Sequence, residues 1–458
     1  MNKLAVLSQY VRLSMRKQFK SKDALWRYQQ KKIQKHLQFV MKNSPFYRNY
    51  YEGYEVAVEQ SATHLLPTID KNMMMEHFDE LNTIGIQKKF AMNMAIQAER
   101  TRDFSPMLKG ISIGLSSGTS GNRGLFLVSK QEQAMWVGAV LAHVVPSPLR
   151  SRHKIAFFLR ANNNLYEGTK SNRLSFSFFD LAKPFSEHRE SLQELQPTIL
   201  VAPASALRHV SEWQQKGIVD ISPQKIIAVA EVLEDIDKAY IESVFNQRVH
   251  QVYQCTEGFL ASTCEHGTLH INEHIIRIEK EYLDEENGVF VPIITDFTRT
   301  SQPIIRYRLN DILVERKHPT NRTKSYECPC GSVFTALERI DGRCDDMFYG
   351  ESNGNGKPIP LFPDFIRRAM LFASDEISEY KVIQHDMQDI EIQVQLQDDT
   401  RQQIVEVNII GELHRYWNEH DLVLPSFRFG TYEEMVSDKK RKRIESRWKG
   451  PTHDSLAQ

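Results

Sequence analysis

Apolar residues form two patterns along this chain. Some stand in short continuous runs, and others recur at spacings of three and four residues. Mainly apolar runs at 154–159, 198–203 and 225–229 are typical of buried strands, and 249–253 is expected to be a further strand; helical spacing separates the later segments. Strands that alternate with helices predict a parallel sheet with helices on its faces. Such sheets bind ligands beyond the carboxyl ends of their strands, so residues that follow these runs are candidates for a site.

The segments around this sheet predict further elements. A long amphipathic helix is expected over residues 24–51, ended at Pro45, and Asp70 is expected to cap another helix. Residues 268–314 carry runs typical of antiparallel strands. From 343 to 363 the composition shifts to Gly, Asn, Ser and Pro, and a smaller set of helices and strands follows.

These patterns predict a mixed α/β and α+β protein of two domains. The first, over residues 1–342, is a large domain with parallel sheets and an antiparallel subdomain. The second, over residues 343–458, is a small α+β domain that acts as a mobile lid.

Composition narrows the classes of partner. Among 458 residues, Lys and Arg together number 58 and so do Asp and Glu, so the formal net charge is zero. A neutral chain gives no global attraction to nucleic acid, and no apolar stretch is long enough to span a membrane.

Residues 1–20 have helical spacing without a signal-peptide core, and packing on the domain is favoured over a membrane-surface role. Five cysteines, an odd number, predict a reducing, cytoplasmic location.

A loop rich in glycine and hydroxyl side chains lies between two strand-like runs. Residues 116–124 read Ser-Ser-Gly-Thr-Ser-Gly-Asn-Arg-Gly, with apolar runs at 111–115 and 125–128. Backbone N–H groups and hydroxyls in such a loop can hold an anion, phosphate above all. A plain hairpin turn explains the same composition, and the loop alone does not separate the two interpretations. The terminal Gly-Lys-Ser/Thr of a P-loop is missing.

Three further motifs follow this loop in order. They are Tyr253-Gln-Cys-Thr-Glu257, Asp296 with Arg306-Tyr-Arg-Leu-Asn-Asp311, and Asp341-Gly-Arg343. Any one carboxylate alone is more often a cap or a paired group. Together with the Gly-rich loop, the motifs resemble the adenylate-forming (ANL) superfamily over nearly the whole chain. More narrowly, the chain is similar to the phenylacetate–CoA ligase branch and its relative that adenylates a deazaflavin coenzyme, in which the loop also lacks the terminal lysine.

The resemblance implies an ATP-dependent, carboxylate-activating ligase. It would form an acyl-adenylate and pyrophosphate from a small carboxylic acid, then pass the acyl group to a thiol of CoA or of a carrier protein. Glu257 would ligate Mg²⁺ and Thr256 would contact the α-phosphate. Asp311 would accept hydrogen bonds from the ribose, and Arg343 would contact ribose or phosphate. The nucleotide-binding residues implied are Ser116, Ser117, Gly118, Thr119, Ser120, Gly121, Ala230, Glu231, Tyr253, Asp311 and Arg343.

The resemblance also implies a catalytic lysine near the C-terminus that reaches the α-phosphate when the small domain closes. The run Ser437-Asp-Lys-Lys-Arg-Lys-Arg443 lies at the matching place. The best register puts this lysine at Lys440, with Lys439 and Lys442 as alternatives. Without the upstream motifs, a solvated basic run would be the preferred interpretation.

Two pairs of metal-ligating residues form a separate signal. Cys264-Glu-His266 and Cys328-Pro-Cys330 are close pairs joined by a longer connection, which favours a structural zinc site. Relatives with a similar Cys-x-Cys-Gly element bind zinc there. His270 is an alternative to His266 as the fourth ligand.

The identity of the acid and of the acceptor is left open by the sequence. Residues 347–363 are longer and more polar than the segment that meets CoA in relatives, so CoA, a carrier-protein thiol, an amine and a hydroxyl all remain acceptors. Aromatic residues at 176–179 are typical of core packing, which is the favoured interpretation, but they would also suit a pocket for an apolar or aryl acid. Two other functions fit the motifs: transfer of AMP to a small-molecule acceptor, and nucleotide binding by a protein that has lost catalysis. A homodimer is compatible with either.

Overall fold

The chain divides into two compact units. A computed structural model describes residues 3–14, 19–116, 123–147, 151–159, 174–181, 183–361, 364–374, 376–397, 399–432 and 442–448. The N-terminal unit comprises Met1–Leu309 and Leu313–Ile340, and the C-terminal unit comprises Asn310–Ile312 and Asp341–Gln458. No helix among the described residues is both long and apolar enough to cross a bilayer.

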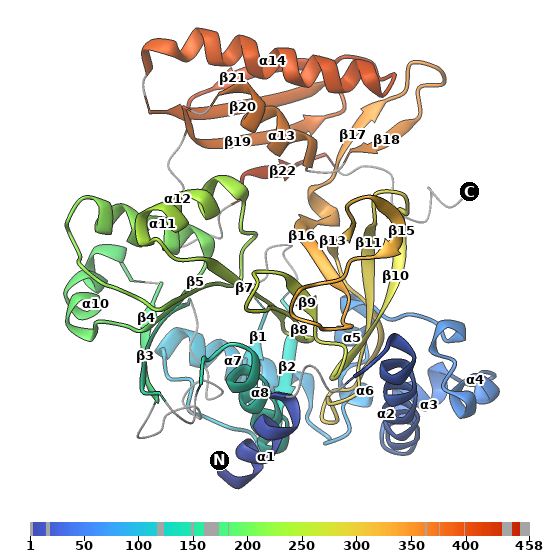
Figure 1. Cartoon of the computed structure of the whole chain (residues 1–458). Helices are drawn as coiled ribbons and strands as arrows, with labels where there is room; N and C mark the ends of the chain where they lie inside the picture. Colours follow the sequence, from blue (N-terminus) through green and yellow to red (C-terminus); the bar gives the residue numbers. More distant parts are fainter. Residues whose placement is uncertain are drawn as a thin grey trace. The chain divides into compact units, whose positions relative to one another are not determined.

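A twelve-stranded sheet runs through the N-terminal unit (Figure 1). Its strands, in chain order, are β3 (His153–Leu159), β4 (Leu174–Asp180), β5 (Ile199–Ala202), β6 (Lys225–Ala228), β7 (Val249–Cys255), β8 (Gly258–Thr263), β9 (Leu269–Ile271), β10 (Ile276–Asp284), β11 (Val289–Asp296), β12 (Ile304–Arg308), β13 (Asp311–Glu315) and β16 (Ala336–Arg343). The order across the sheet is β10-β11-β13-β16-β9-β8-β7-β6-β5-β3-β4, and β12 pairs with β11.

The predicted alternation of strands and helices gives the parallel half of this sheet. Strands β4, β3, β5, β6 and β7 are parallel, and β7, β8 and β9 are antiparallel. Alternate residues of β3 bury on opposite faces: Ala156 and Phe158 join the core beside α11 and α12, while Ile155 and Phe157 join the core on the other face. A parallel strand covered by helices on both faces is apolar throughout, which is why its sequence is a continuous apolar run.

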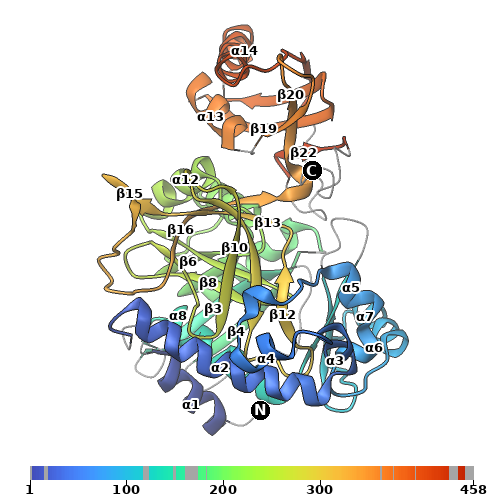
Figure 2. The same ribbon diagram turned by 90° about the vertical axis from the view of Figure 1, so that its right-hand side faces the viewer.

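The remaining elements of this unit surround the sheet. Its α-helices are α1 (Lys3–Ser14), α2 (Lys22–Asn43), α3 (Pro45–Tyr50), α4 (Glu55–Gln60), α5 (Lys71–Glu76), α6 (Phe78–Leu81), α7 (Lys88–Thr101), α8 (Lys130–His143), α10 (Arg189–Leu195), α11 (Ala204–Gln215) and α12 (Asp235–Phe245). Two short hairpins complete it: β1 (Ser112–Leu115) with β2 (Leu125–Val128), and β14 (Lys317–His318) with β15 (Asn321–Ser325). Both views place α1 and α2 at the lower end of this unit (Figure 1 and Figure 2).

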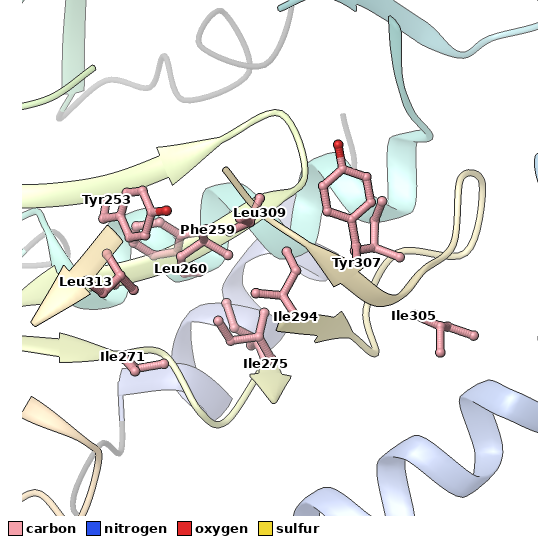
Figure 3. Close-up of a cluster of buried hydrophobic side chains, with 14 of the residues drawn as sticks. Tyr253, Phe259, Leu260, Ile271, Ile275, Ile294, Ile305, Tyr307, Leu309 and Leu313 are labelled. Atoms are coloured by element: carbon pink, nitrogen blue, oxygen red, sulfur yellow. The ribbon is translucent and has the colours of Figure 1, made fainter. Parts of the chain in front are cut away.

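The largest core lies where the antiparallel strands meet the N-terminal helices. Figure 3 shows part of it, with Tyr253 and Phe259 from β7 and β8, Ile294 from β11, and Tyr307 from β12. The phenol of Tyr47 in α3 is buried there too and donates to the carbonyl of Pro303 at 3.1 Å.

The C-terminal unit is a small α+β domain, as the sequence predicts. Its elements are β17 (Phe348–Glu351), β18 (Pro358–Leu361), α13 (Asp364–Ala373), β19 (Ile377–Asp386), β20 (Asp389–Leu396), α14 (Gln402–Glu419), β21 (Ser426–Gly430) and β22 (Ile444–Ser446). Four strands form a sheet in the order β21-β20-β19-β22, and the fully buried Trp417 of α14 belongs to its core.

Two local features add to the expected elements. The long helix ends before Pro45 as predicted, and the residues up to Tyr50 form a second helix, α3, because Ser44 adopts an extended conformation and caps it. The Gly- and Pro-rich segment after Asp346 contains a hairpin of β17 and β18, in which Phe348 pairs with Leu361. The expected cap is confirmed: the carboxylate of Asp70 accepts the backbone N–H of Met73 at 2.9 Å.

The crossing of α1 and α8 depends on a glycine. A Cβ added to Gly138 would lie 2.5 Å from the Cβ of Gln9 and 2.9 Å from the backbone nitrogen of Tyr10. We predict that Gly138→Val destabilises the docking of α1 by about 1–3 kcal/mol, because the added atoms overlap α1. Limited proteolysis should cleave residues 3–14 faster in this variant.

Gly411 provides a matched control for this substitution. It lies within α14, and a Cβ added there meets nothing within 4 Å. Gly411→Ala should leave the cleavage of α1 unchanged. Equal cleavage of Gly138→Val and the unmodified protein would show that α1 does not need the close approach.

Candidate functional site

The Gly-rich loop connects two antiparallel strands. Strands β1 and β2 pair from Ser112 with Val128 to Leu115 with Leu125. At the base of the loop, the backbone N–H of Gly124 donates to Oγ of Ser116 at 2.7 Å, and the N–H of Ser116 donates to the carbonyl of Gly124 at 2.8 Å. Residues 117–122 lie outside the described residues, so the roles predicted for Ser117, Gly118, Thr119, Ser120 and Gly121 stay predictions.

A buried carboxylate occupies the turn between β7 and β8. Cys255 pairs with Gly258, which leaves Thr256 and Glu257 as the two turn residues. Glu257 is 9% exposed; its Oε1 accepts from the hydroxyl of Tyr307 at 3.0 Å and its Oε2 from Oγ1 of Thr256 at 2.9 Å. Two hydrogen bonds leave further lone pairs on both oxygens, so the carboxylate retains capacity to bind a hard cation.

Burial and the neighbouring carboxylate raise the pKa of Tyr307 well above its usual range. Tyr307 therefore stays neutral near pH 7, and its hydroxyl donates a hydrogen bond to Glu257. This hydrogen bond fixes the orientation of the Glu257 carboxylate, and sequence reasoning alone did not identify it.

Arg299 joins this turn to the hairpin that carries the Gly-rich loop. Its guanidinium donates to the carbonyl of Thr256 at 3.0 Å and to the carbonyl of Leu127, in β2, at 3.1 Å. The side chain is only 8% exposed. Gln302 adds two bonds to β2, accepting from the N–H of Leu127 and donating to the carbonyl of Leu125. Sequence reasoning missed both residues, although they lie between Asp296 and Arg306 of a recognised motif.

The carboxylate of Glu132, in α8, binds the backbone of the loop over residues 296–302, which also carries Arg299 and Gln302. It accepts the backbone N–H groups of Thr300 and Ser301 at 2.7 and 2.8 Å, and it completes a capping box with Ser129. Although burial favours its neutral form, the charge of Arg299 and these hydrogen bonds lower the pKa of Glu132. The carboxylate of Glu132 thus orders the backbone of residues 296–302 at Thr300 and Ser301.

Other predicted nucleotide residues lie at the ends of neighbouring strands. Ala230 follows β6 with a positive φ of 65°, and the backbone N–H of Ser205 donates to the carboxylate of the adjacent Glu231 at 3.0 Å. Tyr253 is buried within β7, the strand beside β6. These residues share the carboxyl edge of the parallel strands, where such sheets bind ligands.

Asp311 and Arg343 come together within the C-terminal unit. The Nε of Arg343 lies 4.0 Å from Oδ1 of Asp311, and the N–H of Cys344 donates to the carbonyl of Asn310 at 3.1 Å. Lys442 forms an ion pair with Asp346 at 2.6 Å. Lys439 and Lys440 lie outside the described residues, so the position of the catalytic lysine stays a prediction.

The aromatic segment at 176–179 lies in the edge strand β4. Phe178 and Phe179 line a cavity of about 720 Å³, together with Arg102, Asp180 and His188 among others. Phe176 instead packs against Phe157 with ring centroids 5.2 Å apart. Of the predicted nucleotide-binding residues that the structure describes, none lines this cavity.

Three cysteines and a histidine form a compact, buried group. The thiol and imidazole atoms of Cys264, His270, Cys328 and Cys330 all lie within 4.8 Å of one another. The Sγ atoms of Cys264 and Cys328 are 3.8 Å apart, the spacing expected for two Zn–S bonds of about 2.3 Å in a tetrahedron. These residues therefore fit a structural zinc ion.

The geometry favours His270 over His266 as the fourth ligand, which corrects the first choice made from the sequence. The side chain of His266 is 46% exposed and lies beside Glu265. In His270, Nδ1 meets the carbonyl of Phe334 at 3.1 Å, which leaves Nε2 facing Cys330 at 3.4 Å. The spacing of residues in the sequence could not decide this, because His270 lies within β9 whereas His266 lies in the turn that precedes the strand. Such a carbonyl contact is typical of a metal-bound imidazole.

Comparisons with known proteins agree with this architecture. No family model matches the chain. Protein CapK of Staphylococcus aureus is 23% identical over 429 residues, which cover 91% of this chain and 85% of that protein. A 2-hydroxyisobutyryl-CoA ligase in complex with 2-HIB-AMP is similar in structure, with a TM-score of 0.67 and 16% identity over 93% of this chain and 89% of that chain. An acyl acid amido synthetase in complex with 2,4-DB gives a TM-score of 0.56 at 12% identity, over 100% and 95% of the two chains.

The chain has the fold of the adenylate-forming ligases. The likeness extends over both units of the chain, which confirms the predicted fold class and the resemblance to this superfamily. The particular branch, the substrates and the roles of individual residues are not fixed by a shared fold.

The pH dependence of stability should reveal the buried Asp296. Burial raises its pKa to about 6, although hydrogen bonds from Thr298 oppose the shift. Because the folded state holds this proton more tightly than the unfolded state, the stabilisation is present at low pH and is lost as the pH rises through about 6. Asp296→Asn, which mimics the protonated form, should gain up to about 3 kcal/mol over the unmodified protein between pH 4 and 7. Urea unfolding of both proteins at pH 4 and pH 7 measures the difference in their free energies of unfolding. A difference that is the same at both pH values would contradict a raised pKa for Asp296.

Metal analysis tests the cysteine–histidine group. We predict about one zinc per purified chain, and none after Cys328→Ser combined with Cys330→Ser. Burial raises the pKa of Cys330 to about 12, so zinc binding must displace its proton and should weaken at acidic pH.

The two histidines provide a matched pair for the same measurement. His270→Ala should lower the zinc affinity by at least tenfold, whereas His266→Ala should leave it unchanged. The reverse result would restore the ligand set first expected from the sequence.

Proposed function

We propose that the chain is an ATP-dependent, carboxylate-activating ligase of the phenylacetate–CoA ligase type. In the first step a carboxylate oxygen of the acid attacks the α-phosphorus of ATP, and pyrophosphate leaves. In the second, an acceptor nucleophile attacks the acyl carbon of the acyl-adenylate, and AMP leaves. Such a ligase uses Mg²⁺, which neutralises charge on the phosphates when bound.

The observation that carries this proposal is the oriented carboxylate of Glu257. It lies at the carboxyl edge of the parallel strands, in a two-residue turn, with one oxygen held by Tyr307 and the other by Thr256. A preorganised anionic oxygen of this kind suits a Mg²⁺ ligand beside a polyphosphate. The bound acyl-adenylate in a structure of the same fold supports the proposal.

The roles of the other residues follow from the same proposal. Arg299 keeps the turn and the Gly-rich hairpin in register, and hydroxyl and N–H groups of residues 116–121 hold the β- and γ-phosphates. Ala230, Glu231 and Tyr253 frame the adenine, Asp311 accepts from the ribose, and Arg343 contacts ribose or phosphate. Lys440 stabilises the charge that develops at the α-phosphate, from a C-terminal unit that acts as a lid.

Proteins of similar structure differ in the acceptor to which they transfer the acyl group. One is a CoA ligase and another an acyl acid amido synthetase, which transfer to a thiol and an amine respectively. We favour a thiol, of CoA or of a carrier protein, because the motifs resemble the CoA ligases more closely.

Exchange of labelled pyrophosphate into ATP, measured across a panel of aliphatic and aryl acids, tests the function. A ligase should show exchange only when its acid is present. Binding of ATP without exchange for any acid would favour a nucleotide-binding protein that lost catalysis. AMP transfer to an acceptor without an acid would favour an adenylyltransferase.

The lysine variants locate the catalytic cation. Lys440→Ala should lower the exchange rate by about two to three orders of magnitude with little change in ATP affinity, because the lysine acts in the transition state. Lys439→Ala is the adjacent control and should retain exchange within a few fold. Normal exchange in Lys440→Ala would place the catalytic lysine elsewhere.

A further inference from the structure

Helix α1 presents two different apolar faces. Val6 packs with Ala134 and Val137 of α8, and Leu13 is also buried. Leu4, Leu7 and Val11 lie three and four residues apart, on one stripe, with side chains that are 76%, 42% and 52% exposed. The packing on the domain that was expected for this helix therefore explains Val6 and Leu13, but it does not explain the exposed Leu4, Leu7 and Val11.

Helix α2 combines exposed aromatic residues with basic ones. Its buried side is mainly apolar and includes Leu25, Ile33 and Leu37. On its exposed side Trp26 and Phe39 are 53% and 37% exposed. Exposed basic residues lie between them at Arg27, Lys31 and Lys35.

The charge of this region departs sharply from that of the chain. Residues 1–50 contain twelve basic residues and one acidic residue, in a chain whose formal net charge is zero. Within the described part of the chain, Arg12, Arg27, Lys31 and Lys35 form no ion pair.

The basic residues of the two helices lie within electrostatic reach of one another. Burial, then the charges of Arg12, Lys35 and Lys31, lower the pKa of Lys32. Arg12 belongs to α1 and the other two to α2, so the helices contribute to one positive region at the same end of the unit (Figure 2).

We propose that the exposed residues of α1 and α2 form a surface that binds a bilayer of anionic phospholipids. Basic side chains would contact the headgroups, while Leu4, Leu7, Val11 and Trp26 enter the interface between headgroups and acyl chains. A nucleic acid would satisfy the charges but leaves the aliphatic stripe in water. A second copy of the same basic face would be repelled by like charge.

Sedimentation with lipid vesicles tests this surface directly. The full chain should bind vesicles that contain about one third phosphatidylglycerol, and not vesicles of phosphatidylcholine alone. Binding should fall several-fold when salt rises from about 0.1 M to about 0.5 M. Absence of binding to the anionic vesicles at low salt would overturn the proposal.

Variants separate the charge from the apolar stripe. Lys31→Glu with Lys35→Glu should weaken binding at least tenfold, since each basic residue contributes about fivefold at an anionic surface. Leu4→Gln, Leu7→Gln and Val11→Gln together should weaken it to a similar extent. Two double variants outside this surface are the matched controls and should bind as the unmodified protein does. The apolar control is Ile404→Gln with Val407→Gln in α14, where the two residues are 63% and 71% exposed. The charge control is Lys89→Glu with Lys216→Glu, at two exposed lysines.

Two further outcomes would contradict the proposal. Vesicle binding that survives loss of the aliphatic stripe, together with equal binding to double-stranded DNA, would assign the region to polyanions in general. A dimer that dissociates on Leu7→Gln, without vesicle binding, would assign the stripe to self-association. Each variant should keep the circular dichroism spectrum and pyrophosphate exchange of the unmodified protein, which excludes misfolding as the cause.

Discussion

The buried guanidinium of Arg299 is the interaction on which the candidate site depends. It bonds to the carbonyls of Thr256 and Leu127, and so ties the turn that carries Glu257 to the strand that follows the Gly-rich loop. Its charge is balanced by Glu132, whose own carboxylate orders the backbone at Thr300 and Ser301.

This arrangement places the described base of the Gly-rich loop and the carboxylate of Glu257 in one candidate site. The loop is expected from its sequence to offer backbone and hydroxyl donors. Its position comes from the β1–β2 hairpin, which Gln302 and Arg299 fix to the large sheet. Glu257 likewise gains its orientation from Tyr307, a residue of β12 that lies fifty positions away in the sequence.

Much of the fold could be predicted because its patterns are local. Most of the parallel strands could be predicted from mainly apolar runs, because a strand that is covered on both faces is apolar throughout. The end of the long helix at Pro45 could be predicted from the proline, whereas the β17–β18 hairpin was missed, because a turn within polar sequence leaves little periodic signal. Glu257 and Asp311 could be named from motifs, whereas Arg299, Gln302 and Glu132 act through contacts between segments far apart in the chain. The choice between His266 and His270 also required the structure, since four residues separate them and only geometry shows which one faces the cysteines.

The acyl-adenylate intermediate is the central claim of the proposed function, and isotope transfer tests it most directly. An acid that supports pyrophosphate exchange would be labelled with ¹⁸O in its carboxylate and turned over with ATP and an acceptor. The account predicts that AMP gains one ¹⁸O atom, because a carboxylate oxygen bonds to the α-phosphorus and leaves with it. Label in inorganic phosphate, or AMP without label, would contradict it.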